Sequence, residues 1–163
     1  MTFTERFSDF VCEGDSIACE IDGFEIVARI VRDDCPDAPD ERQDGFWPSL
    51  YKDAPGFIGP GPNHRQRFAK AQAEAEAVMA AWRKDEWFYC GIILSVSLDG
   101  VTLESHAASL WGVEANYPDS DNAYLTEVTR ELLPEALDAG RAVARPRRHD
   151  DAARTPGGRA RWR

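Results

Sequence analysis

The sequence lacks a long hydrophobic run, a paired-cysteine motif and a recognisable targeting segment. No stretch approaches the roughly 20 apolar residues of a membrane-spanning helix, and the first ten residues are too polar and acidic for a secretory signal. We therefore expect a cytoplasmic protein with reduced thiols. The cysteines match no zinc spacing, so no metal site and no cofactor is predicted from them. They are Cys12, Cys19, Cys35 and Cys90.

Basic residues are also scarce over most of the chain. Residues 1–140 hold 11 basic and 27 acidic side chains, a net charge of −16, whereas residues 141–163 hold eight arginines and two aspartates. Such an acidic body excludes non-specific duplex binding, because that affinity comes from cations that neutralise phosphates. The length and the 43% hydrophobic content favour one folded domain over residues 1–140. The arginine-rich tail over 141–163 has little apolar content and is expected to be disordered.

Two Asp-Gly dipeptides predict two β-hairpins. The first joins the alternating segments 16–21 and 24–31, and the second joins 87–98 to 101–105. Asp-Gly tolerates the positive φ angles that a two-residue hairpin turn requires. A short further strand is expected at 110–115.

Two other segments carry apolar residues at helical spacing. The first, 65–85, follows a possible capping box at Asn63, and the second spans 124–139. Pro134 is expected to kink or split the second helix, and Gly140 to end it. Together these elements predict an α+β fold in which an antiparallel sheet, built from the two hairpins, carries both helices on one face.

The connection between these parts, residues 33–62, is about 30 residues long, against a usual ~4–6, and contains six prolines. Such a loop is functional, mobile or packed as a lid. Between positions 33 and 53 it has seven acidic and two basic residues. Its carboxylates either face solvent, bind a divalent cation or form a surface that binds a partner. The candidate partner-binding carboxylates are Asp33, Asp34, Asp37, Asp40, Glu41 and Asp44.

Three aromatic residues, Phe46, Trp47 and Tyr51, are interspersed with these charges. Aromatic side chains amid charge are typical of interface anchors, so all three are candidate anchors for a protein partner. The alternative is that they form a lid over the sheet.

A second row of carboxylates lies on the second predicted helix. Glu127, Glu131, Glu135 and Asp138 are spaced by four, four and three residues and so share one helix face. Steps of four residues are about 6 Å along a helix, on the scale of the ~3.4 Å axial spacing of nucleic-acid phosphates. This row is either a solvated face that keeps the protein soluble or a surface for lysines and arginines that normally hold nucleic acid.

No established catalytic motif is present. The sequence contains no nucleophile elbow, phosphate-binding loop or His-Glu-x-x-His. His106 has no partner nearby in sequence, although one can converge in space. We therefore do not expect an enzyme. A small metal-dependent enzyme, or one that uses His106, remains an alternative.

Four segments carry a resemblance to a known family: Phe10–Ser16, Arg42–Ser49, Asp85–Gly91 and Asn116–Asn122. They are similar to small uncharacterised proteins of proteobacterial plasmids, integrative elements and phages, over about residues 5–140. The resemblance assigns no chemistry to any residue. It implies a context, because small acidic proteins of mobile elements often resemble anti-defence factors such as anti-CRISPR and anti-restriction proteins.

The favoured hypothesis is a non-enzymatic inhibitor that blocks the basic nucleic-acid-binding surface of a CRISPR effector or restriction complex by charge mimicry. Its partner is then a protein, and its body contacts neither nucleic acid nor membrane. The first alternative is an interaction module of a mobile element's replication or transfer machinery. The second is the small metal-dependent enzyme.

Overall fold

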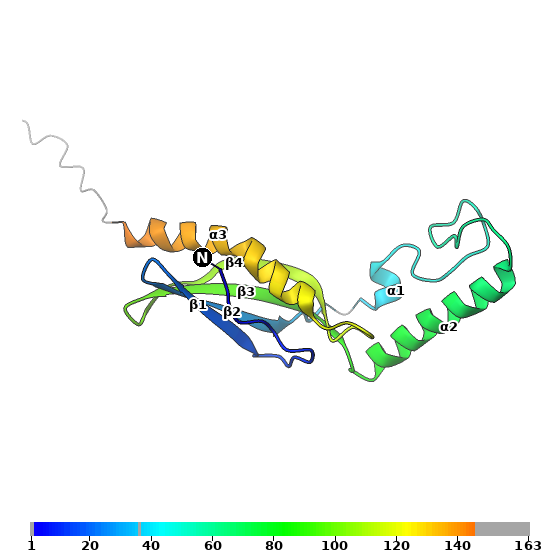
Figure 1. Ribbon diagram of the computed structural model, residues 1–163, viewed down its shortest axis with the longest axis horizontal. Coiled ribbons are helices and arrows are strands. Elements are labelled where there is room, and N and C mark those ends of the chain that lie inside the picture. Colours follow the sequence, from blue (N-terminus) through cyan, green and yellow to red (C-terminus); the bar gives the residue numbers. More distant parts are fainter. Residues whose placement is uncertain (1, 36, 146–163) are drawn as a thin grey trace, which may run out of the picture.

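A single sheet forms the centre of the molecule. The computed structural model describes residues 2–35 and 37–145. Four strands pair in the antiparallel order β1-β2-β3-β4 (Figure 1), which confirms the predicted α+β class. None of the described helices combines the length and apolar character needed to span a bilayer. In chain order the elements are β1 (Ser16–Ile21), β2 (Phe24–Arg32), α1 (Pro39–Arg42), α2 (His64–Arg83), β3 (Phe88–Leu98), β4 (Val101–Ala115) and α3 (Ala123–Ala144).

Both predicted hairpin turns are confirmed. Asp22 and Gly23 have φ angles of 54° and 83°, and Asp99 and Gly100 have 49° and 77°. Positive φ at both central residues is the type I′ pattern, whose twist matches that of the flanking strands. The register therefore follows from the turns, with Ile21 opposite Phe24.

The helices are arranged differently from the prediction. α3 lies along one sheet face and packs on β3 and β4, whereas α2 leads away from the end of the sheet (Figure 1). Only α3 therefore takes the predicted place on the sheet. The apolar positions of α2 are mostly alanines, and only Ala75 and Met79 are buried. This helix packs instead against the loop that precedes it.

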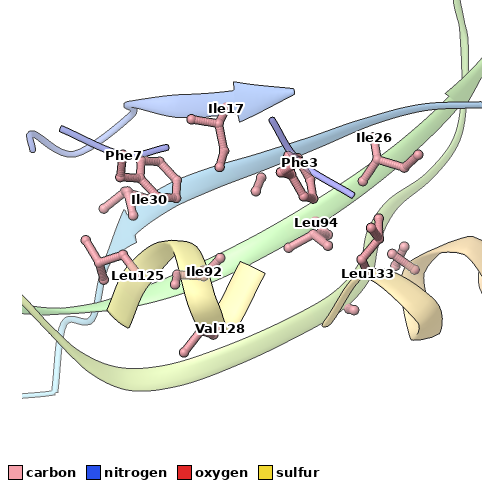
Figure 2. Packing of buried hydrophobic residues seen from close by; sticks show 14 of the residues in the cluster. Phe3, Phe7, Ile17, Ile26, Ile30, Ile92, Leu94, Leu125, Val128 and Leu133 are labelled. Atoms are coloured by element: carbon pink, nitrogen blue, oxygen red, sulfur yellow. The ribbon is translucent and has the colours of Figure 1, made fainter. Parts of the chain in front are cut away.

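The N-terminal segment completes the core between β1 and α3 (Figure 2). Phe3, Phe7 and Val11 are buried, with Phe3 wholly inaccessible to solvent. Thr126 on α3 accepts a hydrogen bond from the Phe7 amide at 3.1 Å. This extended segment has no regular hydrophobic period, so its sequence gives no local sign that it belongs to the core.

α3 also differs in detail. It runs through Pro134 as one continuous helix and ends at Ala144, so the predicted split and the predicted stop at Gly140 are wrong. A Cβ at Gly140 would lie 2.6 Å from Val96 Cγ1, so this glycine allows close approach of α3 to β3. Residues 146–163, most of the predicted tail, lie outside the described residues.

β4 is one strand of 15 residues rather than two short pieces. Bulges interrupt its pairing with β3. At one of them the Trp111 ring lies over Gly91, where a Cβ would be 2.5 Å from Trp111 Cε3. Bulges of this kind bend and twist an edge strand and make further pairing less favourable.

Candidate acidic interface

The outer face of α3 carries the predicted row of carboxylates. Leu125, Val128 and Ala136 are buried against the sheet, which turns the opposite side of the helix to solvent. Glu127, Glu131 and Glu135 are exposed there. Within the described residues none of these three carboxylates forms an ion pair. The fold therefore presents three exposed carboxylates at steps of about 6 Å along one helix. Arg6 and Arg130 line a pocket together with Glu127, so the charge at that end of the row is partly balanced.

The fourth residue of the row, Asp138, is in a different environment. Its carboxylate lies 3.6 Å from Arg141, which also contacts Asp22 in the first hairpin turn at 2.8 Å. Arg141 thereby links the end of α3 to the β1–β2 turn and compensates part of the charge of Asp138. The rest of the row consists of Glu127, Glu131 and Glu135, which we call the α3 acidic face.

Most carboxylates of the 33–62 loop have local structural partners. Asp40 accepts a hydrogen bond from Trp47 Nε1 at 3.2 Å. Glu41 accepts one from the Ala38 amide at 3.0 Å and so caps α1. Asp37 accepts a long contact from the Cys35 thiol at 3.5 Å. These groups hold the loop in shape, whereas Asp34 and Asp44 are exposed without such contacts within the described residues.

Asp33 belongs to a partly buried cluster at the base of the loop. Its carboxylate pairs with Arg42 at 3.1 Å, and the Arg42 guanidinium lies over the Tyr89 ring, 4.0 Å from its centroid. Burial alone would raise the pKa of Asp33, but the hydrogen bonds and the charge of Arg42 hold this pKa below its usual range. Asp33 therefore anchors the loop to β3, and its side chain, 17% exposed, offers a partner little surface.

The three predicted aromatic anchors differ strongly in exposure. Tyr51 is 81% exposed. Trp47 stacks edge-on against Phe46, with ring centroids 5.2 Å apart, and is 36% exposed. Phe46 is half-buried and lines a cleft of about 400 Å³ between the loop and α2. Only Tyr51, beside the exposed Leu50, presents most of its ring to solvent.

Arg67 fastens the end of the loop to α2. Its guanidinium donates hydrogen bonds to four backbone carbonyls, those of Ile58, Gly59, Gly61 and Pro62, at 3.1 to 3.4 Å. Asn63, predicted to begin a capping box, instead has φ 57° and makes no side-chain cap hydrogen bond. The loop is therefore held by an arginine that the sequence patterns did not single out.

Arg67→Lys is expected to loosen this loop, because one ammonium group cannot reach four carbonyls in the geometry of a guanidinium fork. We expect amide hydrogen exchange at Ile58, whose N–H bonds to Ser49 O, to become about tenfold faster. Arg65→Lys is the control, because Arg65 lies exposed on the same helix without such contacts within the described residues. Equal exchange rates in the two variants would contradict the role of Arg67.

The structure does not join the two acidic surfaces. The α3 acidic face lies over the sheet, whereas the 33–62 loop lies beyond the end of the sheet beside α2 (Figure 1).

The segments that carry the family resemblance do meet, near the end of the sheet where α3 begins. Trp87 contacts Tyr117 edge-on, with ring centroids 4.9 Å apart, Arg42 covers Tyr89, and the Asn116 side chain bonds both backbone groups of Val11. These segments act together in packing.

The other candidate groups are the possible metal ligands, the buried thiol of Cys90 and His106. In residues 2–35 and 37–145 no three His, Cys, Asp or Glu side chains come together as a metal site. Cys90 is buried in the core, and burial raises the pKa of its thiol to about 12, which makes it unreactive. His106 has a partner close by in the sequence, since its Nε2 lies 2.9 Å from Oγ of Ser109, three positions on. The expectation that it has no partner nearby in sequence is therefore wrong.

Comparisons with known proteins leave the family open. No family model and no solved structure matches this chain. A stretch of 74 residues is similar to ribonuclease HII of Nitrobacter hamburgensis, with 35% identity, and covers 40% of this chain. The chain spans only 28% of the length of that relative.

Proposed function

We propose that this protein is a non-enzymatic inhibitor of a nucleic-acid-targeting defence complex in the cytoplasm, of the CRISPR or restriction type. The observation that carries the proposal is the α3 acidic face. Three exposed carboxylates lie in one row on a helix whose other side is buried in the core. None of them forms an ion pair within the described residues. Like charges at these spacings destabilise an isolated helix, so the row costs stability that packing must supply.

The α3 acidic face suits a basic channel better than it suits nucleic acid itself. Its carboxylates repel phosphates and attract the arginines and lysines that bind them. Because the helix backbone is held by the core, little ordering entropy is lost when a partner binds. Tyr51 lies apart from this face, on the loop that Arg67 fastens. It offers a second, separate contact, because aromatic side chains are frequent energetic centres of protein interfaces.

The experiment is a phage-plating assay in CRISPR-immune and restriction-proficient hosts that express the full chain. The proposal expects plating efficiency to rise in at least one of these hosts. Unchanged plating in all of them, together with capture of a purified replication or transfer protein of a mobile element, would favour the adaptor alternative instead.

Reversing Glu127, Glu131 and Glu135 to lysine is expected to abolish protection and to weaken binding to the purified target complex by about tenfold or more. The matched control reverses Glu13, Glu20 and Glu25, which are equally exposed but lie in the N-terminal half of the chain. Both triple variants change the net charge by the same amount. If both lose protection equally, overall charge rather than the α3 acidic face is responsible.

A degradation assay completes this test. Because part of the chain is similar to a ribonuclease, destruction of the guide RNA is the competing explanation for a loss of CRISPR activity. The purified chain is therefore incubated with the guide RNA alone, with and without Mg²⁺. The proposal expects intact RNA, and degradation would replace inhibition by an enzymatic explanation.

A further inference from the structure

The sheet face opposite α3 carries a groove of about 370 Å³, within the usual size range of small-molecule sites. Val31 on β2 and Ile93 on β3 form its apolar floor, and both are half-buried. Arg29 pairs with Ile93 in the strand register. Residues opposite each other in an antiparallel pair point to the same side, so the guanidinium stem rises from the same floor.

A bulge in β4 builds the other wall. Leu94 pairs with Ala108 and Val96 with Glu104, so the three residues 105–107 stand opposite Ser95 alone. Bulges re-aim side chains and are frequent beside functional sites. Here the bulge brings Ser105 and His106 into the lining. The contact between His106 Nε2 and Ser109 Oγ holds the imidazole ring.

The polar groups of the groove have unused hydrogen-bonding capacity. Arg29 is exposed and makes no side-chain hydrogen bond or ion pair within the described residues, although the body around it has a net charge of −16. The Ser95 and Ser105 hydroxyls also make no such bond there. Thr102 Oγ1 accepts from Ser97 at 3.5 Å, which leaves its own hydrogen available. A guanidinium fork and three hydroxyl donors thus surround one space.

We propose that this groove binds a small organic phosphate, such as a nucleoside monophosphate. The forked guanidinium of Arg29 binds two phosphate oxygens, and the hydroxyl donors supply bonds for the third. A carboxylate has only two oxygens and leaves part of this donor set unused. The apolar part of the ligand lies on Val31 and Ile93. The groove lies on the face opposite α3, so this site is independent of the proposed inhibitor function.

The test is an NMR titration of the labelled full chain with adenosine monophosphate, with adenosine and inorganic phosphate as separate arms. We expect adenosine monophosphate to shift the Ile93 methyl, Arg29 Nε and His106 ring signals and to saturate below about 10 mM. Adenosine should bind much more weakly because it lacks the anion. Inorganic phosphate should bind more weakly because it lacks the apolar part.

Arg29→Ala is expected to reduce the affinity for adenosine monophosphate by about tenfold or more. The control is Arg83→Ala, which removes the same charge from the exposed end of α2. His106→Ala is a second variant. It removes a side chain that lines the groove and leaves Arg29 and its pairing with Ile93 in place. Four results would each overturn the proposal. The first is an absence of shifts at the groove. The others are an affinity for inorganic phosphate or for adenosine equal to that for adenosine monophosphate, and equal losses of affinity in the two arginine variants.

Discussion

Phe3→Ala is expected to lower the free energy of unfolding by about 3–5 kcal/mol, the range for removing a buried aromatic side chain from a core. Phe3 is 0% exposed and belongs to the core cluster over the sheet, as does Phe7 (Figure 2). Its removal leaves a cavity in this core. The segment has no regular secondary structure of its own that could shift to refill the space.

Urea unfolding followed by fluorescence of the five tryptophans measures this loss. Phe10→Ala is the matched control, because Phe10 belongs to the same segment but is 64% exposed. The control should change stability by less than about 0.5 kcal/mol. If both variants lose the same stability, the N-terminal segment does not form part of the core.

Asn122→Ala is expected to cost about 2–5 kcal/mol, from buried groups left without partners and from alanine in a left-handed conformation. Asn122 is 1% exposed with φ 59°. Its side chain accepts a bond from the Asn116 amide at 2.9 Å and donates to Ser8 O, Asp9 O and Asn116 Oδ1. These bonds tie the N-terminal segment to the start of α3.

The network and backbone contributions can be separated with Asn63→Ala. Asn63 has nearly the same φ, 57°, but is exposed and makes no side-chain cap hydrogen bond. It should therefore show only the backbone cost, about 1–2 kcal/mol. The difference between the two variants in thermal unfolding measures the buried network, and a difference near zero would contradict its importance.

The parts of the fold that follow from local chemistry were predictable from the sequence. Asp22-Gly23 and Asp99-Gly100 determine both hairpins, because few dipeptides accept positive φ at both positions. The spacing of Leu125, Val128 and Ala136 likewise identifies the buried side of α3 and, by elimination, its acidic face.

The remaining parts depend on contacts between residues far apart in the chain. Asn116 bonds to Val11 across 105 positions, and no local pattern marks such a pair. The alanines of α2 indicate a close packing partner but do not specify whether it is the sheet or the loop. The bulge that brings His106 to Arg29 depends on the register of β3 and β4, which hydrophobic alternation alone does not determine.

The same limit applies to the candidate site. The sequence places Glu127, Glu131 and Glu135 in one row but cannot show that Arg141 takes up part of the charge of Asp138. It also groups the carboxylates of the 33–62 loop as one surface, whereas the fold assigns Asp33, Asp40 and Glu41 to internal contacts. The fold therefore leaves Glu127, Glu131 and Glu135 exposed as predicted, but not all the predicted carboxylates of the loop.

Competition for DNA tests the central claim most directly. The complex against which plating shows protection is purified and titrated with the chain in the presence of labelled target DNA, at several salt concentrations. We expect the chain to displace DNA and its apparent affinity to fall as salt rises. Reversal of Glu127, Glu131 and Glu135 should remove both effects, whereas reversal of Glu13, Glu20 and Glu25 should retain them. Simultaneous binding of the chain and DNA, or displacement that the α3 reversal leaves unchanged, would contradict it.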